Sequence, residues 1–414
     1  MKRLLSLLLF GIAGLPVFGE LGVDVAVVPQ APWNRMVDIW VTLSGAADST
    51  EYKVRLVAHY TGCPADGLEA RALQTEPVIT GSGRHRLVWD LGKDAPGLVA
   101  DDFAVTAEVT PFAATDALYR VIDLSGGPEA TSYPSRYAFA APDLSDDTCR
   151  TTELWLKRVP AGTFTMGSGT GSSASIAAHT VRLTKAFYMA IFPTTQAQWA
   201  QVMGDWPSFF ENADCRAVRP VESVSFARIR GHNGWYDSKA SVGTDTFVGR
   251  LRAKSTWAGL ELPSNAQWEY VCRAGTTGRF YFDGEEKDVV RYARTTLSNS
   301  ATDDCNQDLT KGTSKVGSYP ANPWGFYDFY GNVCQLVPDG AKSANWSGMT
   351  FPDLTEDPRW AFDEDKGVVF SGIRCGSAWN ENAGQVNSSL RRWTQYLNKD
   401  GDRGFGFRIC INAD

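Results

Sequence analysis

The sequence lacks several features that mark common classes of protein. It has no dense run of Lys or Arg and a net charge of −7, which argues against a nucleic-acid partner. It has four His and no CxxC or Cys/His cluster, which argues against a zinc or His-ligated iron site. No stretch after residue 19 is long and apolar enough to cross a bilayer, so we expect no transmembrane segment in the mature chain.

The first 19 residues have the pattern of a secretory signal peptide. Lys2 and Arg3 precede the apolar run LLSLLLFGIAGL, and Val17-Phe18-Gly19 offers a cleavage site before Glu20. The alternative is an uncleaved membrane anchor. We expect a protein that is secreted, periplasmic or on the cell surface.

Eight cysteines remain to be explained in an exported chain. Their even number favours disulfides. Since they are widely spaced, the sequence alone leaves their connectivity open.

Short alternating segments follow the signal. Between residues 20 and 140, apolar and polar residues alternate over short spans that turn-rich pieces separate. This pattern predicts an all-β sandwich of immunoglobulin or fibronectin type. Nothing catalytic is evident there, so a spacer or interaction module is the simplest interpretation.

The composition changes after a connection at residues 126–152 that is rich in Ser, Gly, Pro and Ala, and we place the linker between the two domains at residues 141–153. Residues 154–414 are rich in loops and contain three helical patterns: one after Thr195, one ending near residue 258, and one after Ser264 that stops at Gly275. We therefore expect a second domain of α+β class with little regular secondary structure.

The stretch from Arg374 to Arg408 is the least ordinary part of that domain. It holds six Asn or Gln, five Arg and two Trp. Such a composition is poor in secondary-structure propensity, so the surrounding fold must hold the segment. It is either a ligand-facing wall or a structural closure.

Six short motifs occur in an order that resembles a known family. They are FTMGS, RPVESVSF, LPSNAQWEYVCRAGT, KVGSYPANPWGFYDFYGNV, RCGSAW and GFGFR. In this order they resemble the formylglycine-generating, sulfatase-modifying-factor family over roughly residues 158–411. The resemblance implies an elaborated C-type-lectin-like fold with bound calcium.

The resemblance also implies copper chemistry that this chain lacks the residues to perform. Active relatives bind copper through two cysteines after a GGSW-like motif, because Cu(I) prefers soft thiolate ligands. Counted from Trp379, these positions hold Glu381 and Val386. The motif that usually reads GNVWEW is GNVCQL here, with Cys334 and Gln335. We expect a non-catalytic relative without copper.

Four cysteines have candidate roles in the light of this resemblance. Cys272 and Cys410 lie near positions where the family often carries a structural disulfide. Cys334 and Cys375 replace residues near the family's pocket, and we expect them to form a second disulfide there. The competing hypothesis is a relocated thiol pair with redox or copper activity.

A calcium loop is implied by the segment DFYGNVCQ. Its ligands would be Asp328, the carbonyl groups of Gly331 and Val333, and Gln335. Replacing the usual Glu by Gln335 should weaken calcium binding. The alternative is that Asp328 and Asn332 satisfy backbone groups of the turn.

The candidate ligand-binding residues come from the stretch that begins at Arg374. Aromatic faces and Arg forks suit a glycan or a protein or peptide ligand. The candidates are Ser377, Trp379, Asn380, Glu381, Arg391, Arg392 and Trp393. Two functions remain: an exported binding protein, or an oxidoreductase that oxidises a protein cysteine through a divergent site.

Overall fold

The structure is a computed structural model that describes most of the chain. The described residues are 21–113, 116–168, 176–231, 241–255, 257–296, 312–341, 354–358, 371–394 and 402–412. The predicted signal peptide and Cys305 lie outside them. None of the described helices combines the length and apolar character needed to cross a lipid bilayer.

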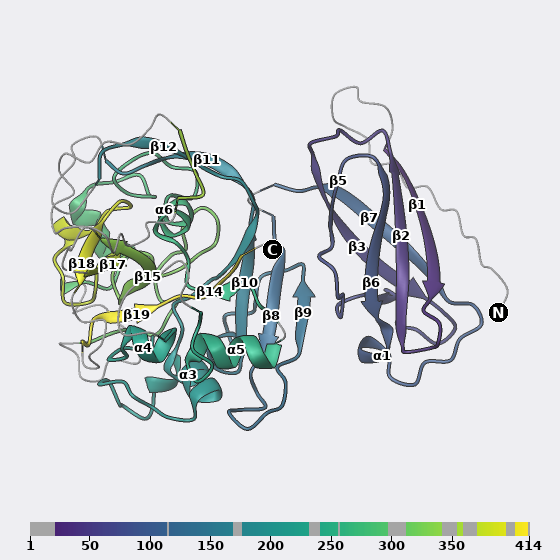
Figure 1. The fold of residues 1–414 in the computed structure, drawn as a ribbon, viewed down its shortest axis with the longest axis horizontal. Coiled ribbons are helices and arrows are strands. Elements are labelled where there is room, and N and C mark those ends of the chain that lie inside the picture. Colours follow the sequence, from purple (N-terminus) through teal and green to yellow (C-terminus); the bar gives the residue numbers. More distant parts are fainter. Residues whose placement is uncertain are drawn as a thin grey trace. The chain divides into compact units, whose positions relative to one another are not determined.

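The chain divides into two compact units. Unit 1 runs to Asp116 and also takes in Arg136–Ala138, and unit 2 comprises Ala117–Ser135 and Phe139–Asp414 (Figure 1). The division lies earlier than the sequence predicted, because Tyr119–Asp123 pairs with a strand of the C-terminal sheet. The predicted linker 141–153 likewise contains a helical turn, Thr148–Thr151, and the start of that strand.

Unit 1 is built from two antiparallel sheets, as the alternating pattern predicted. One sheet has the order β1-β2-β6, and in the other β3 pairs with β4, β5 and β7. The elements are β1 (Gly22–Pro29), β2 (Met36–Ser44), β3 (Glu51–His59), β4 (Leu68–Glu69), β5 (Val78–Thr80), β6 (Gly83–Asp90), α1 (Leu91–Asp94) and β7 (Ala104–Pro111).

Alternate residues of these strands form the core of unit 1. Val37, Ile39 and Val41 of β2 are buried, and so are Val54 and Leu56 of β3. Successive side chains of a strand point to opposite faces, so each sheet buries one face and leaves the other at the surface.

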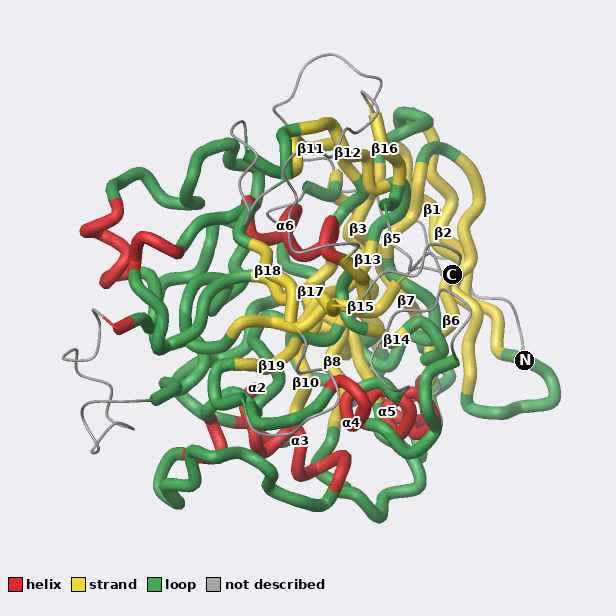
Figure 2. The backbone as a smooth tube through the Cα atoms, turned by 60° about the vertical axis from the view of Figure 1, so that its left-hand side comes forward, coloured by secondary structure: helices red, strands yellow, loops and turns green. Residues whose placement is uncertain are grey.

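Unit 2 contains three sheets and few helices. The sheets have the orders β14-β20-β13-β10-β8-β9, β11-β12-β16 and β18-β17-β15-β19. Figure 2 shows how much of this unit consists of loops. The strands of these sheets are β8 (Tyr119–Asp123), β9 (Ser135–Ala138, of which only Ser135 is assigned to unit 2), β10 (Glu153–Val159), β11 (Gly162–Met166), β12 (His179–Leu183), β13 (Phe187–Ala190), β14 (Leu260–Glu261), β15 (Cys334–Ala341), β16 (Leu354–Glu356), β17 (Ser371–Cys375), β18 (Arg391–Thr394), β19 (Phe405–Phe407) and β20 (Cys410–Asn412).

Two helices of unit 2, α3 and α6, begin where the N-cap residues predicted. Thr195 and Ser264 each form a capping box with the Gln three residues later, which satisfies the first free N–H groups of the helix. The described helices are α2 (Thr148–Thr151), α3 (Gln196–Met203), α4 (Phe226–Ile229), α5 (Phe247–Ser255), α6 (Asn265–Arg273) and the short 3-10 helices η1 (Arg216–Val218), η2 (Glu286–Arg291) and η5 (Ala383–Gln385). Every residue of α6 is buried, so this helix lies inside the unit.

Candidate functional site

The sheet β18-β17-β15-β19 positions the residues that the sequence singled out. On β15 and β17, Gln335 lies opposite Cys375, and on β17 and β18, Cys375 lies opposite Arg391. These three side chains therefore share one face of the sheet, and the intervening residues Cys334 and Arg374 belong to the other face.

The face that carries Gln335 is a buried polar network around α6. Gln335 Oε1 accepts hydrogen bonds from Trp268 Nε1 at 2.8 Å and from Arg408 Nε at 3.0 Å. Its Nε2 donates to the Asp328 carbonyl at 2.8 Å. Arg391 on the same face forms an ion pair with Glu269 of α6. These groups tie the sheet to the helix and have no exposed surface to offer a ligand.

Two of the four predicted calcium ligands, Asp328 and Gln335, are engaged in this network. Asp328 Oδ2 accepts from the Gly317 N–H at 2.7 Å, and both ends of the Gln335 amide are bonded to protein groups. The buried Arg408 guanidinium donates to carbonyl groups of Ala190 and Tyr327 beside them. In the described part of the chain no three His, Cys, Asp or Glu side chains are grouped so as to hold a metal. Asp328 and Gln335 are thus satisfied by protein groups, and calcium binding at this loop stays a prediction.

The opposite face of the sheet carries a charged cluster that we call the Glu381 cluster. It consists of Cys334 of β15, Arg374 of β17, Arg392 of β18 and Glu381 of the loop that follows β17. Arg374 Nη1 and Arg392 Nη1 donate to Glu381 Oε1 at 3.1 and 2.7 Å, and Arg374 Nη1 also lies 3.0 Å from Cys334 Sγ. Position 381 is where the family resemblance places a copper-binding cysteine. In this chain it holds a carboxylate that accepts hydrogen bonds from two guanidinium groups.

Neither predicted disulfide is present. Cys334 and Cys375 are free thiols because β15 and β17 direct them to opposite faces of the sheet. Cys272 on α6 is also a free thiol, so the bond to Cys410 is absent. Burial raises the pKa of Cys334 to about 12 despite the opposing effect of Arg374, so this thiol is protonated at neutral pH.

The other predicted ligand residues are dispersed. Ser377 is buried and accepts a hydrogen bond from the Gly331 N–H at 3.0 Å. Val386 is fully buried, Asn380 is exposed, and the side chain of Trp393 lies outside the described part. Of the predicted residues whose side chains the structure describes, Trp379, Asn380, Glu381 and Arg392 are the ones that reach the surface.

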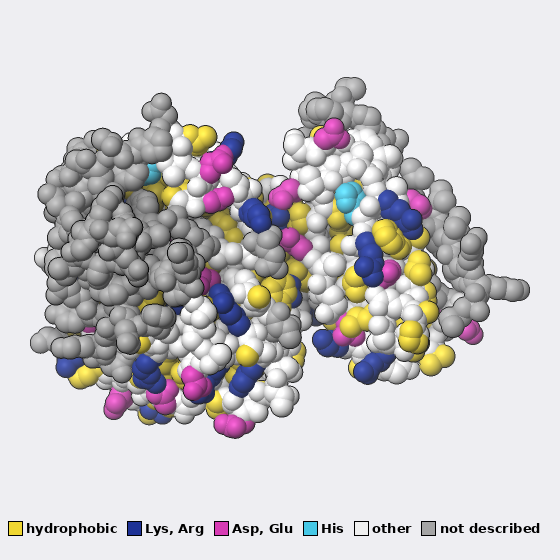
Figure 3. Space-filling model, in the orientation of Figure 1, with side chains coloured by type: hydrophobic (Ala, Val, Ile, Leu, Met, Phe, Trp, Pro, Cys, Tyr) yellow, Lys and Arg dark blue, Asp and Glu magenta, His cyan; other side chains and the backbone are white. Residues whose placement is uncertain are grey.

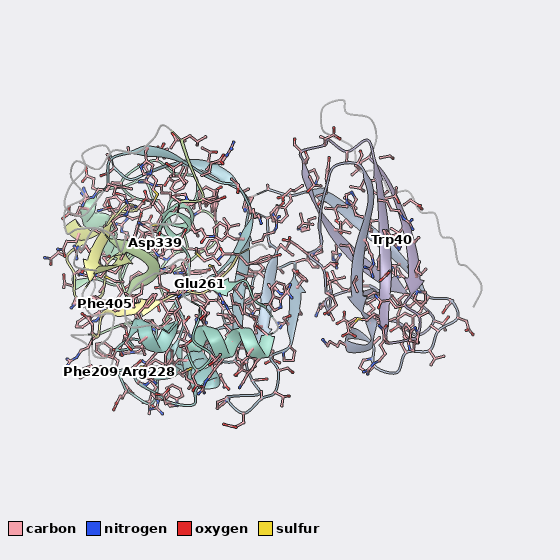
Figure 4. The ribbon with its side chains drawn as sticks, in the orientation of Figure 1. Trp40, Phe209, Arg228, Glu261, Asp339 and Phe405 are labelled. Atoms are coloured by element: carbon pink, nitrogen blue, oxygen red, sulfur yellow. The ribbon has the colours of Figure 1, made fainter. Side chains whose placement is uncertain are left out.

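An aromatic surface next to Trp379 was missed by the sequence reasoning. The Trp379 ring lies 5.5 Å from Phe210, and Phe210 lies 5.4 Å from Phe209. Phe209 is 49% exposed and is labelled in Figure 4. Trp206, three residues earlier in the sequence, is 38% exposed, and the Arg216 guanidinium lies 4.3 Å from its ring centroid. We call Trp206, Phe209, Phe210 and Trp379 the aromatic ridge. Three aromatic residues within DWPSFFE were the available signal.

Buried polar groups fix the backbone that carries Phe209 and Phe210. Glu222 is fully buried; its Oε1 accepts from the Phe210 N–H at 3.1 Å, and its main chain exchanges hydrogen bonds with Ser208 Oγ. Burial raises the pKa of Glu222. The Trp379 indole N–H donates to the Arg403 carbonyl at 3.0 Å, and the Arg403 guanidinium lies 3.3 Å from the Phe209 ring centroid. The exposed rings are therefore fixed in place.

Unit 2 is a domain of α+β class with sparse secondary structure. It contains a buried, capped helix, α6, and a sheet whose edge strand β19 comes from the GFGFR motif. A family model for the sulfatase-modifying factor enzyme 1-like domain matches residues 143–413. The chain belongs to this family, and its predicted family and fold class are confirmed.

Similarity to individual members is limited. The chain is 28% identical over 273 residues to the serine/threonine-protein kinase pkn1 of Chlamydia pneumoniae, which covers 62% of this chain and 39% of that protein. It is 26% identical over 211 residues to the formylglycine-generating enzyme of Mycobacterium tuberculosis, covering 42% and 70%. The structure of PvdO from Pseudomonas aeruginosa matches with a TM-score of 0.47 at 21% identity, covering 63% of this chain and 95% of PvdO. The chain spans about two fifths of the length of the chlamydial protein.

Proposed function

We propose that this chain is an exported, non-catalytic binding protein for a glycan or peptide. The proposal rests on the ion pairs that Glu381 forms with Arg374 and Arg392. Where the family resemblance places a copper-binding cysteine, a carboxylate is held by Arg374 and Arg392. The second such position is the buried Val386, which has no ligand atom.

The aromatic ridge supports a binding role. Exposed aromatic rings cost solvation free energy, and fixed ones lose little conformational entropy when a ligand packs on them. Phe209 and Trp206 are exposed, while Glu222 and Ser208 fix the chain that carries them. The ridge thereby offers a preorganised contact surface beside the Glu381 cluster.

The second candidate function is an oxidoreductase that uses Cys334. The contact with Arg374 at 3.0 Å favours it, since a guanidinium stabilises a thiolate. Two facts oppose it: the side chain of Cys334 is completely buried, and burial raises its pKa to about 12. A protonated, inaccessible thiol is a poor nucleophile and a poor copper ligand.

Arrays of glycans and peptides probed with the full chain test the proposal. We expect a ligand whose binding Phe209→Ala weakens by about tenfold, the loss of one well-packed aromatic contact. Leu354→Ala is the matched control, because Leu354 is 45% exposed on β16 of the same unit and should leave binding unchanged. Equal binding by the wild type and Phe209→Ala would contradict a role of the aromatic ridge in ligand binding.

A further inference from the structure

Unit 1 carries an exposed tryptophan that the proposed function does not use. Trp33 lies in the loop between β1 and β2 and is 58% exposed. Among the described residues it makes no ring contact, cation–π contact or side-chain hydrogen bond. An exposed indole without partners costs solvation free energy, so its position calls for an explanation.

The loop around Trp33 is fixed by hydrogen bonds. The Gln30 N–H donates to the Met36 carbonyl at 3.1 Å, and the Met36 N–H donates to Asn34 Oδ1 at 3.0 Å. Asn34 Nδ2 donates to Gln30 Oε1 at 2.9 Å, and Gln30 Nε2 donates to Asp38 Oδ1 at 2.7 Å. The side-chain amides of Gln30 and Asn34 flank Trp33 in the sequence. Together with the Asp38 carboxylate they form a continuous series of hydrogen bonds.

The neighbouring surface of the sheet carries charged and aromatic side chains. Asp38 and Trp40 belong to its outer face, because Val37, Ile39 and Val41 are buried. Arg86 binds Asp38 through two hydrogen bonds of 2.9 Å. Figure 3 shows hydrophobic and basic side chains together on unit 1, and Figure 4 labels Trp40 there.

Trp40 and Trp33 differ in what covers them. The Arg84 guanidinium lies 4.1 Å from the Trp40 ring centroid and covers one of its faces. No described side chain stacks on Trp33. Of the two rings, Trp33 is therefore the one with faces open to a ligand.

We propose that Trp33, Gln30 and Asn34 form a saccharide-binding site on unit 1. The C–H face of a sugar ring packs on the indole, whose π face carries partial negative charge. Sugar hydroxyls both donate and accept, and each of the two amides keeps one N–H beyond the bonds named above. The hydrogen-bonded loop sets this geometry before binding, which lowers the entropy cost.

The size of the patch favours a sugar over a protein or a membrane. A stable protein interface buries about 800 Å² on each partner around an apolar centre. Trp33 and Val28 are the large apolar side chains that are exposed on these two strands and their loop, and polar groups surround them. One ring with flanking amides matches one sugar ring.

The test uses the full chain on an array of defined neutral and acidic oligosaccharides, followed by titration of the best-bound one. We expect Trp33→Ala to weaken binding at least about tenfold and Trp33→Tyr to restore part of it, since Tyr keeps a stacking face. Val99→Ala, at a position 93% exposed on the same unit, should bind like the wild type.

Three results would overturn the inference: no oligosaccharide binds, binding survives Trp33→Ala, or Trp33→Ala abolishes binding to phosphatidylcholine–phosphatidylserine vesicles instead. The site is independent of the aromatic ridge, so Phe209→Ala should leave this titration unchanged. A ligand lost only with Phe209→Ala would support the ridge and count against the Trp33 site.

Discussion

Glu381 lies where the family resemblance places a copper-binding cysteine, and two arginines neutralise its charge. Its carboxylate accepts hydrogen bonds from Arg374 and Arg392, and all three side chains are mostly buried. An ion pair in such a place stabilises the fold only while both charges are present, because an unpaired buried charge is costly.

Replacing Glu381 by Gln should therefore destabilise the protein. The variant leaves two guanidinium groups without their shared carboxylate, and we expect the free energy of unfolding to fall by about 1–3 kcal/mol. Glu286→Gln is the control: Glu286 pairs with Arg279 at the surface, so its loss should change stability little. Urea unfolding measures both. Equal effects in the two variants would mean that the Glu381 cluster is not a structural closure.

Asp328 gives a second residue-scale expectation, in its dependence on pH. Burial raises the pKa of Asp328 to about 6, above the value of about 3.9 in an unfolded chain. Between these values the folded protein holds a proton that the unfolded chain has released. The free energy of unfolding contributed by Asp328 therefore falls as pH rises from about 4 to 6.

Asp328→Asn removes this titration and keeps the acceptor for the Gly317 N–H. Relative to the wild type, the variant should gain stability between pH 4 and pH 7, on the order of 2–3 kcal/mol. Urea unfolding of both proteins at four pH values in this range measures the difference. Other titrating groups, such as His179, are common to both and cancel. A difference that does not vary with pH would contradict the raised pKa.

At the scale of elements, strand alternation explains which sequence predictions failed. Arg391 and Arg392 were both predicted to bind a ligand, and Cys334 and Gln335 were given separate roles, in a disulfide and in a calcium loop, without regard to the faces of the strand. The strands place each pair on opposite faces, so Arg391 serves the buried network and Arg392 serves the Glu381 cluster.

The face of a strand residue was hard to predict here because these strands lack a clear alternating pattern. Polar side chains occur on both faces of the sheet, and the Gln335–Trp268–Arg408 network depends on contacts between distant parts of the sequence. Two helix starts were easier: the N-cap residues Thr195 and Ser264 are local signals, and the helices that follow them were predicted.

The thiol state follows from the same strand geometry. When the unreduced protein is unfolded and alkylated, Cys272, Cys334 and Cys375 should each carry the label. Peptide mass spectrometry with and without prior reduction provides the comparison. Label at Cys334 and Cys375 that appears only after reduction would show that the two strands do not have this register.

At the scale of the whole molecule, the motif order predicted the family and fold class, whereas composition placed the unit boundary too late. The Ser-, Gly- and Pro-rich segment looked like a connection, yet part of it forms α2 and is bound by the fold: the Arg150 guanidinium on α2 donates to the Val316 carbonyl. Low-propensity sequence marks a linker only where no tertiary partner holds it.

The central claim is that this family member binds and does not oxidise. Titration of the full chain with Cu(I), followed by an assay of cysteine-peptide oxidation with oxygen, tests it most directly. The account predicts no stoichiometric Cu(I) binding and no aldehyde product, with the same result for Cys334→Ser. One equivalent of tightly bound Cu(I) and turnover that Cys334→Ser abolishes would contradict it.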